Sequence, residues 1–353
     1  MTSWPEPSSI AADAACRYDF PRVSIVLLAY EQAELVSEAV RSCLMQDCPP
    51  LEILLSDDCS SDDTYARLRD AAAGYSGPHH VMVRRNPFNM GIGAHYNALL
   101  EASSGELLVT AAGDDVSTPD RVSRLVAAWN ANGRRADLLC SHVNDIDLQG
   151  QRHGLIRVDD LGTYAGVNDW LRRRPYIIGA GHAFTRRMMT RFGPLRPGII
   201  YEDQVMVFRA ILGGGAITVD APLVDYRRGG SSAPPQAHDH DDLKKLDDWN
   251  ERQLEPILAE MRQMVDDARI AGCEPLVESH LRVPIQDRLF ALGLLRSHNV
   301  SDRWHALRTA PQLPIGWRLR KVLQRTFPRT TSRVKALIRL RKQLGSRTAR
   351  RCR

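Results

Sequence analysis

Cysteine is scarce in this chain, and the cysteines present are not paired along the sequence. The 353 residues include seven Cys, an odd number, and no two of them form a Cys-x-x-Cys pair. This scarcity excludes a disulfide framework and a Cys-rich zinc site as the basis of the fold. We therefore expect a protein of a reducing compartment, the cytoplasm.

Long apolar runs are also missing. The longest one, residues 23–30, is interrupted by Ser24 and is far shorter than the roughly 20 residues that a membrane-spanning helix needs. Residues 1–20 contain no apolar block of the kind found in secretory signals, and we expect them to form an N-terminal tail. The sequence gives no sign of a membrane-embedded protein.

Acidic residues are absent from one end of the chain. The chain has 47 Lys and Arg against 42 Asp and Glu, but no acidic residue follows Asp302. Residues 303–353 hold 16 of the basic residues, so the first 302 residues carry a net charge of −11 and the remainder carries +16. This asymmetry predicts an anionic partner for the basic tail.

The basic tail also shows a helical pattern. Val334, Leu337, Ile338 and Leu344 recur near helical spacing among Arg and Lys residues. Basic amphipathic helices lie on anionic membranes, so we favour a peripheral position on the inner face of the cell membrane. A solvated tail and a nucleic-acid-binding segment are the alternatives, and nucleic acid is the less favoured because aromatic residues that could stack on bases are sparse here.

Short apolar runs alternate with amphipathic helical patterns over the first 143 residues. Strands are predicted at 22–30, 51–55, 81–83, 106–110 and 138–143, and helices at 33–45, 62–73, 93–102 and 119–131. The alternation predicts an α/β fold with a mostly parallel sheet, in which ligands bind beyond the carboxyl ends of the strands. The later pattern is less regular, with helices near 166–173, 186–192 and 203–212, a loop at 229–242, and long helices at 243–270 and 276–296.

Three pairs of acidic residues follow apolar or small-residue stretches. They are Asp57-Asp58, Asp114-Asp115 and Glu202-Asp203. A carboxylate pair at a strand end can hold a divalent cation through oxygen, and the cation can in turn hold phosphates. Any one pair could equally be a helix cap or a solvated turn. Three such pairs in one α/β pattern favour a binding site.

The order and spacing of these motifs resemble those of family-2 glycosyltransferases, which have the GT-A fold. The resemblance covers residues 22–232. In the first half it rests on Val-Ser-Ile-Val at 23–26 with Tyr30, Asp-Asp-Cys-Ser-Ser-Asp at 57–62, Asn-Met-Gly at 89–91, Asn97, Gly105-Glu106, and Gly-Asp-Asp at 113–115 with Pro119. In the second half it rests on Gly-His-Ala-Phe at 181–184, Gly193-Pro194, Glu202-Asp203, Arg209, Gly213 and Tyr226-Arg227.

The resemblance implies transfer of a sugar, with inversion, from a nucleoside-diphosphate sugar, and a UDP-linked donor is favoured. It places donor-nucleotide contacts at Ala29, Tyr30, Glu31, Asp57, Asp58, Asn89, Gly91, Asn97 and Asp114. It also implies that Asp115 binds Mn²⁺ or Mg²⁺, which would neutralise the departing diphosphate. Asp203, beside Glu202, would accept the proton of the acceptor hydroxyl. We expect the acceptor to be a saccharide or a lipid-linked saccharide in cell-surface glycan or polysaccharide biosynthesis.

The sequence departs from the family pattern in three places. Ala112 stands where the commonest metal motif has Asp, and Tyr96 stands where Arg is frequent. The Gln-x-x-Arg-Trp motif of processive synthases is absent from the sequence, which argues against a processive, membrane-embedded synthase. Two rival functions remain: a nucleotidyltransferase, although residues 29–32 lack its basic Gly-rich loop, and a non-catalytic module that binds sugar nucleotides or nucleic acid.

The expected organisation has four segments. The N-terminal tail at 1–20 is followed by a GT-A domain at 21–232, a helical extension at 233–302 and the basic helical tail at 303–353. Within the GT-A domain, we expect residues 21–120 to form the nucleotide-sugar half and residues 121–232 to form the acceptor half.

Overall fold

The computed structural model describes residues 20–228, 240–308 and 310–327, with the side chains of 240–248 excepted. The amphipathic pattern predicted around 334–344 lies outside these residues, as do the N-terminal tail up to residue 19 and most of the predicted loop at 229–242.

The chain divides into two compact units. The first contains the residues up to 234 together with 255–277, and the second contains 235–254 together with the residues from 278 onward. Most contacts of each unit are made between residues of that same unit. None of the helices in the described ranges is long and apolar enough to cross a membrane.

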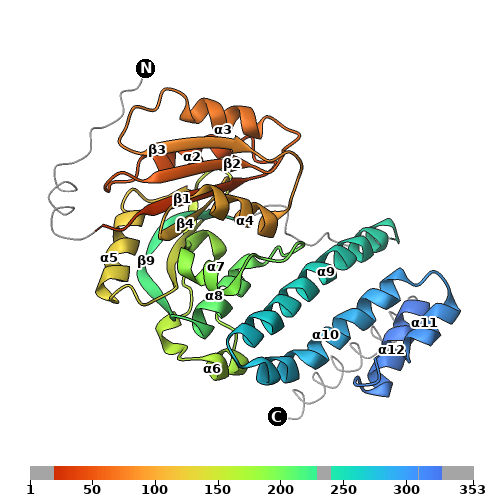
Figure 1. The fold of residues 1–353 in the computed structure, drawn as a ribbon. Helices are drawn as coiled ribbons and strands as arrows, with labels where there is room; N and C mark the ends of the chain where they lie inside the picture. Colours follow the sequence, from red (N-terminus) through yellow and green to blue (C-terminus); the bar gives the residue numbers. More distant parts are fainter. Residues whose placement is uncertain (1–19, 229–239, 309, 328–353) are drawn as a thin grey trace, which may run out of the picture. The chain divides into compact units, whose positions relative to one another are not determined.

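A mixed, mostly parallel sheet forms the centre of the first unit (Figure 1). Among the described residues its strands lie in the order β3-β2-β1-β4-β8-β6-β9-β5, with β7 paired to β6. The predicted α/β class is thereby confirmed. The strands are β1 Val23–Ala29, β2 Glu52–Asp57, β3 His80–Arg85, β4 Leu107–Ala112, β5 Val116–Ser117, β6 Leu138–Ile146, β7 Arg152–Ile156, β8 His182–Thr185 and β9 Ala216–Arg227.

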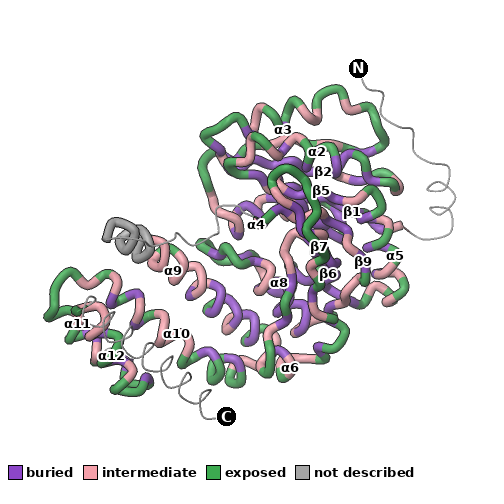
Figure 2. Tube along the Cα trace, turned by 180° about the vertical axis from the view of Figure 1, so that it is seen from behind, coloured by how far each residue is buried: buried purple, intermediate pink, exposed green. Residues whose placement is uncertain are grey.

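One face of the sheet is covered by three amphipathic helices. These helices, α2 (Val36–Leu44), α3 (Thr64–Ala72) and α5 (Arg121–Ala131), share a hydrophobic core with Ile25 and Leu27 of β1. Successive residues of a strand point to opposite faces, which is why alternate residues of β1 enter this core. Figure 2 shows the buried residues concentrated along the strands.

The helix α4 (Ile92–Ala102) packs on the other face of the sheet. His95 of this helix shares a hydrogen bond of 2.6 Å with Ser56 of β2, and Tyr96 donates to Thr110 of β4 at 3.1 Å. The remaining helical segments of this part of the chain are α6 (Val167–Arg172), α7 (Arg186–Phe192), α8 (Glu202–Leu212) and the 3₁₀ turns η1 (Leu161–Thr163) and η2 (Gly179–Gly181).

The sequence patterns missed four strands, β5, β7, β8 and β9. β9 is long, but it contains Asp220 and Pro222, which break the alternation of apolar residues that predicts a strand. Its pairing with β6 changes register on both sides of His142, so the strand is irregular in the structure as well. β5 has two residues and β8 has four, lengths at which periodicity gives no signal.

A segment far along the chain completes the first unit. α9 (His240–Ile270) supplies Asp267, which accepts hydrogen bonds of 2.8 and 3.1 Å from Arg209 of α8. Both side chains are fully buried. Arg209 also donates to the carbonyl of Gly193 at 2.9 Å, and Glu260 accepts from Arg174 at 2.7 Å. Residues 255–277 therefore stabilise the unit that contains the sheet.

The second unit has a small core of its own. It contains α11 (Val300–Ala306), α12 (Ile315–Thr326) and α10 (Glu274–Arg296) from residue 278 on. The ring of Trp317 lies 5.7 Å from that of Phe290, centroid to centroid. The buried residues of this core are Phe290, Leu294, Ala306, Ala310, Leu313 and Val322.

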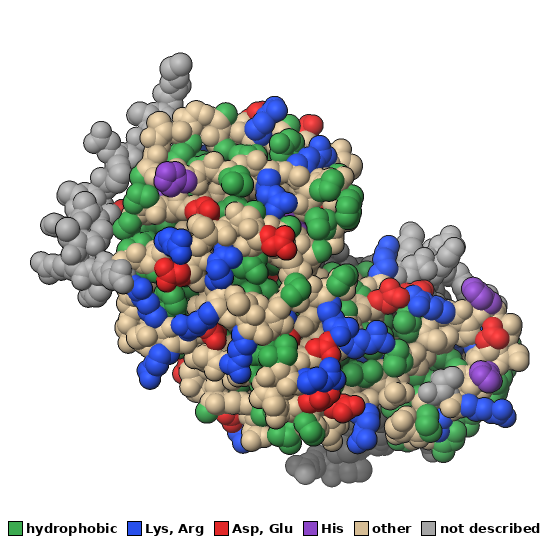
Figure 3. Space-filling model, in the orientation of Figure 1, with side chains coloured by type: hydrophobic (Ala, Val, Ile, Leu, Met, Phe, Trp, Pro, Cys, Tyr) green, Lys and Arg blue, Asp and Glu red, His purple; other side chains and the backbone are tan. Residues whose placement is uncertain are grey.

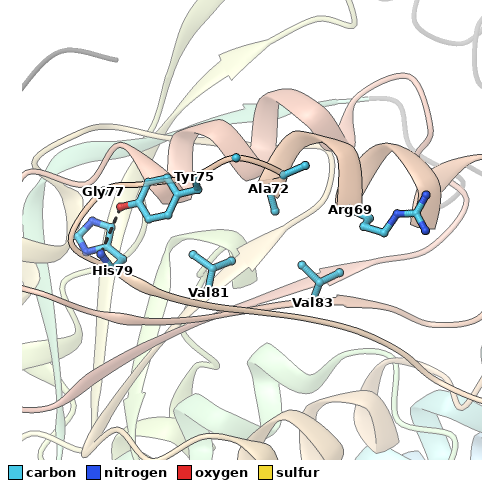
Figure 4. Close-up of a pocket in the computed structure, with 9 residues that line it drawn as sticks. Arg69, Ala72, Tyr75, Gly77, His79, Val81 and Val83 are labelled. Carbon is cyan, nitrogen blue, oxygen red and sulfur yellow. Dashed lines mark hydrogen bonds between the residues drawn. The ribbon is translucent and has the colours of Figure 1, made fainter. Parts of the chain in front are cut away.

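A hollow lies between α3 and β3 at one edge of the sheet (Figure 4). Tyr75 accepts a hydrogen bond of 3.3 Å from the backbone of His79, and the two rings stack. The residues that line this hollow include no acidic residue and none of the predicted site residues. The hollow is therefore not the predicted donor site.

The buried pair of Arg209 and Asp267 predicts a large effect on stability. Asp267→Ala leaves a buried guanidinium without its counter-charge, and the free energy of unfolding should fall by about 3–5 kcal/mol. The matched control is Asp266→Ala, because Asp266 pairs with Arg196 and Arg269 where all three side chains are partly exposed. Such pairs contribute about 0–1 kcal/mol. Urea denaturation followed by tryptophan fluorescence measures both variants, and equal losses would contradict the role assigned to Asp267.

Candidate active site

Three neighbouring parallel strands bring two of the acidic pairs to one edge of the sheet. β2, β1 and β4 are adjacent, and their register sets Ala29 beside Asp57 and Leu28 beside Ala112. The carboxyl ends of parallel strands meet at the same edge, so Asp57-Asp58 and Asp114-Asp115 follow strands that end together. This is the arrangement that the sequence predicted.

The loops after β1 and β2 are held together by side-chain hydrogen bonds. The backbone N–H of Glu31 donates to Ser60 at 2.9 Å, and the carboxylate of Glu31 accepts from the N–H and the hydroxyl of Ser61 at 2.8 and 2.9 Å. Glu31 and Cys59 both have positive φ angles, 54° and 61°, which are uncommon for residues other than glycine. Tyr30 is 46% exposed at the tip of β1. The loops are thus fixed in an unusual conformation with one aromatic ring open to solvent.

The first acidic pair supports these loops. Asp57 is completely buried and binds Ser60 and Arg85, with the Arg85 Nε 3.1 Å from its carboxylate. These contacts hold the loop after β2 in place. The predicted contact of Asp57 with the donor stays a prediction.

Asp58 organises the next loop in a similar way. Its carboxylate accepts from Asn86 at 2.7 Å and from the backbone N–H groups of Met90 and Gly91 at 2.9 Å each. Asn89 also accepts from the N–H of Gly91, whose φ of 75° suits glycine. Asp58, Asn89 and Gly91 therefore lie together, as the motif order implied.

Asn97 has a structural role that the motif did not reveal. Its amide donates to the carbonyl of Leu195 at 2.8 Å and accepts from the N–H of Leu195 at 2.9 Å. Since both polar groups of this amide are engaged by the backbone, Asn97 ties α4 to the segment before α8. The predicted contact of Asn97 with the donor stays a prediction.

The second acidic pair directly follows a point where the chain after β4 approaches the end of β1 closely. A Cβ on Gly113 would lie 2.4 Å from Gln32 Oε1 and 2.9 Å from Ala29 Cβ, so only glycine fits there. Asp115 accepts from the N–H of Arg227 at 2.9 Å. Burial and the neighbouring charge of Asp114 raise the pKa of Asp115 to about 8, and burial also raises the pKa of Asp114. These surroundings therefore disfavour the ionised form of Asp115.

The third acidic pair opens α8. Glu202 is buried, Asp203 is half-buried, and a Cβ on Gly179 would lie 3.1 Å from the Glu202 carboxylate. Burial and the charge of Asp203 raise the pKa of Glu202 to about 8, and burial raises the pKa of Asp203 to about 6. The backbone of Gln204 donates to Asp203 at 2.7 Å. Glu202 and Asp203 thus form a coupled pair that is less acidic than ordinary carboxyl groups.

Arg121 links the second and third pairs, and the sequence analysis did not identify it. Its guanidinium is buried and donates to Ser117 at 2.9 Å and to the carbonyl of Ala180 at 2.6 Å. Ser117 lies two residues after Asp115, and Ala180 follows Gly179, which touches the third pair. The Arg121 charge lowers the pKa of Asp115, while burial lowers the pKa of Arg121 to about 10. The sequence signal that could have revealed Arg121 is a charged residue at the start of a helix face that is otherwise apolar.

Arg227 is a second cation at this edge. In the sequence it stood out only as part of the Tyr226-Arg227 motif. It stands at the end of β9, donates to the backbone carbonyl of Asp114 at 2.6 Å and pairs with Glu38 of α2. Its backbone N–H also donates to the Asp115 carboxylate, so Arg227 borders the acidic edge on the side of β9. Such an edge, with buried carboxylates and two fixed cations, can bind a phosphate-bearing ligand through a metal and can accept a proton.

Comparison with known proteins agrees with this geometry. Residues 24–192 match the family model described as glycosyl transferase family 2. The succinoglycan biosynthesis protein ExoO of Rhizobium meliloti is 26% identical over 332 residues, which cover 82% of this chain and 92% of that protein. The putative colanic acid biosynthesis glycosyl transferase WcaA of Escherichia coli is 28% identical over 131 residues, 37% of this chain and 45% of that protein.

The fold is also similar to that of a solved glycosyltransferase. The crystal structure of S. aureus TarS 1–349 in complex with UDP-GlcNAc matches with a TM-score of 0.51 and 14% identity, and the match covers 82% of each chain. At this identity the likeness concerns the fold, which is the GT-A type that the sequence motifs predicted. Residues 24–192 thus resemble glycosyl transferase family 2, and over most of its length the chain is similar to a curated polysaccharide biosynthesis protein and has a GT-A type fold.

Proposed function

We propose that this chain transfers a sugar, with inversion, from a nucleoside-diphosphate sugar to a saccharide or lipid-linked saccharide in polysaccharide biosynthesis. The observation that carries the proposal is the position of buried Arg121 between the segments that adjoin the acidic pairs at 114–115 and 202–203, since its guanidinium donates to Ser117 and to the carbonyl of Ala180. The names of ExoO and WcaA, which refer to succinoglycan and colanic acid biosynthesis, support the pathway class. The UDP-GlcNAc bound to TarS supports a UDP-linked donor.

The nucleotide end of the donor would lie at the loops after β1, β2 and β3. Tyr30 offers an exposed ring on which a base can stack, beside Ala29 and Glu31. Asn89 and Gly91 follow β3 and are fixed by Asp58. Because hydrogen bonds already order these loops, little conformational entropy needs to be lost when the nucleotide binds.

The second acidic pair suits a hard divalent cation, Mn²⁺ or Mg²⁺. The raised pKa of Asp115 shows that its negative charge is under-compensated, and oxygen ligands are what these ions prefer. Within the described residues, no group of three or more His, Cys, Asp or Glu is placed to hold a metal alone. Asp115 would therefore hold the ion together with oxygen ligands from outside this set, while Asp114 would contact the ribose of the donor. When bound, the ion would neutralise charge on the departing diphosphate.

Asp203 is our candidate for the general base. A group with a pKa of about 6 is largely ionised at neutral pH and still able to accept a proton. Glu202, with its higher pKa, keeps its proton, so the pair holds one negative charge. Asp203 would take the proton of the acceptor hydroxyl as its oxygen bonds to the anomeric carbon. The bond to the diphosphate breaks on the opposite side, which inverts the anomeric centre.

Removing the base should abolish turnover and spare donor binding. Asp203→Asn keeps the shape of the side chain and loses its basicity, so kcat should fall by about 10²–10⁴-fold. The dissociation constant for UDP should stay within about twofold of the wild-type value, because the substitution removes no predicted donor contact. The matched control is Asp220→Asn on β9, whose side chain is 87% exposed. An unchanged kcat in Asp203→Asn would assign the base elsewhere.

The same residue predicts a pH dependence. The base works only when it is deprotonated, so kcat/KM should fall as the pH drops through about 6, higher than an ordinary Asp would give. Initial rates of UDP release measure the profile. A flat profile down to about pH 5 would contradict the assignment, because an Asp with an unperturbed pKa of roughly 4 would still be ionised there.

Metal dependence rests on Asp115. Asp115→Asn removes a charged oxygen ligand, so the tightening of UDP binding by Mn²⁺ should drop by at least about a hundredfold, more than the loss of an outer-shell partner causes. Calorimetric titration with and without Mn²⁺ measures this difference. Asp70→Asn on the exposed side of α3 is the control. Equal Mn²⁺ effects in Asp115→Asn and wild type would exclude Asp115 as a metal ligand.

A further inference from the structure

α12 presents two different faces. Its inner face carries Trp317 and Val322 and packs on the core of the second unit. Ile315 and Leu319 stand four residues apart and therefore share one side of the helix, where they are 62% and 36% exposed. Ile315 and Leu319 thus form an exposed apolar strip on this helix.

The charges around the strip are all of one sign. α12 contains Arg318, Arg320, Lys321 and Arg325 and no acidic residue, and Arg320 and Lys321 are exposed. The preceding helix adds an exposed Trp304, 41% accessible. Figure 3 shows hydrophobic side chains interspersed with basic and acidic ones on this face of the molecule. An exposed apolar strip within a basic surface is typical of helices that lie in a membrane interface.

Charge also decides which occupant the strip fits. Residues 328–353, which lie outside the described residues, contain ten Lys or Arg and no acidic residue, so they bring no counter-charge to α12. A second copy docked strip to strip would bring the same positive charges together. Nucleic acid would satisfy the cations but would leave Ile315 and Leu319 without apolar contacts. An anionic lipid surface satisfies both, since headgroups meet the cations and acyl chains meet the apolar strip.

We infer that α12 is a membrane-contact helix that inserts Ile315 and Leu319 into an anionic lipid interface, flanked by Arg320 and Lys321. The contact goes beyond the proposed transfer reaction and does not depend on it. It lies on the second unit, whereas the acidic edge lies on the first. It would hold the enzyme on the surface where lipid-linked acceptors are found.

The test is vesicle sedimentation of the full-length chain. Vesicles of phosphatidylcholine alone are compared with vesicles of equal parts phosphatidylcholine and phosphatidylglycerol, at low and high salt. The wild type should sediment with the anionic vesicles only, and salt should weaken the binding because the Debye length falls from about 10 Å at 0.1 M to about 3 Å at 1 M. Ile315→Ser with Leu319→Ser should lower the partition coefficient by at least about tenfold while retaining every charge.

The control is Val283→Ser with Leu289→Ser, a pair of similarly exposed apolar residues on α10 with Asp287 between them. This control should bind vesicles as the wild type does. UDP binding and the melting temperature are measured on every variant, so a folding defect or a failed donor site is distinguished from a lost membrane contact. Three results would overturn the inference: no binding of the wild type to anionic vesicles, equal binding of the Ile315 and Leu319 double variant, or tighter binding to a single-stranded oligonucleotide that the double variant retains in full.

Discussion

Burial of carboxylates beside one another is the constraint on which the rest of the first unit depends. Asp115 and Glu202 have little contact with water, and each ionised carboxylate buried in this way costs several kcal/mol unless it is compensated. Arg121 supplies part of that compensation and cannot lose its proton under ordinary conditions. The site therefore combines a fixed positive centre with carboxyl groups whose protonation can change. A metal ion and a diphosphate would complete the balance of charge, which links binding of the donor to the state of the acids.

The loops at the acidic edge are shaped before any ligand arrives. Asp57 and Asp58 bind protein donors on Ser60, Asn86, Met90 and Gly91, and the strained φ angles of Glu31 and Cys59 persist because these bonds hold them. A motif of two acidic residues can thus act by building a binding loop and not only by touching the ligand. The first acidic pair thus supports the binding loops, in addition to the donor contacts that the family resemblance implies for it.

The sequence predicted the elements whose signals are local. The strands at 22–30 and 51–55 stood out because they are continuous apolar runs, and the edge that gathers Asp58, Asp114 and Asp115 followed from the parallel order of those strands. The missed features depend on partners distant in sequence. β9 is a strand because it pairs with β6 across two register shifts, Asn97 is structural because Leu195 lies beside it, and nothing near Arg121 in the sequence reveals that Ala180 accepts its hydrogen bond.

The unit that carries the acidic edge is discontinuous along the chain, and this has a consequence for how the protein is made. During synthesis, Arg209 leaves the ribosome well before Asp267, its only buried counter-charge among the described residues. Until residues 255–277 have emerged, α8 can pack fully on the sheet only by burying an uncompensated guanidinium, which is strongly unfavourable. We therefore expect the helix that carries Glu202 and Asp203 to settle last, once residues 255–277, which follow the motif region at 22–232, have left the ribosome. The acidic edge would then stay incomplete on nascent chains, so a partly made enzyme would have no means of transferring sugar.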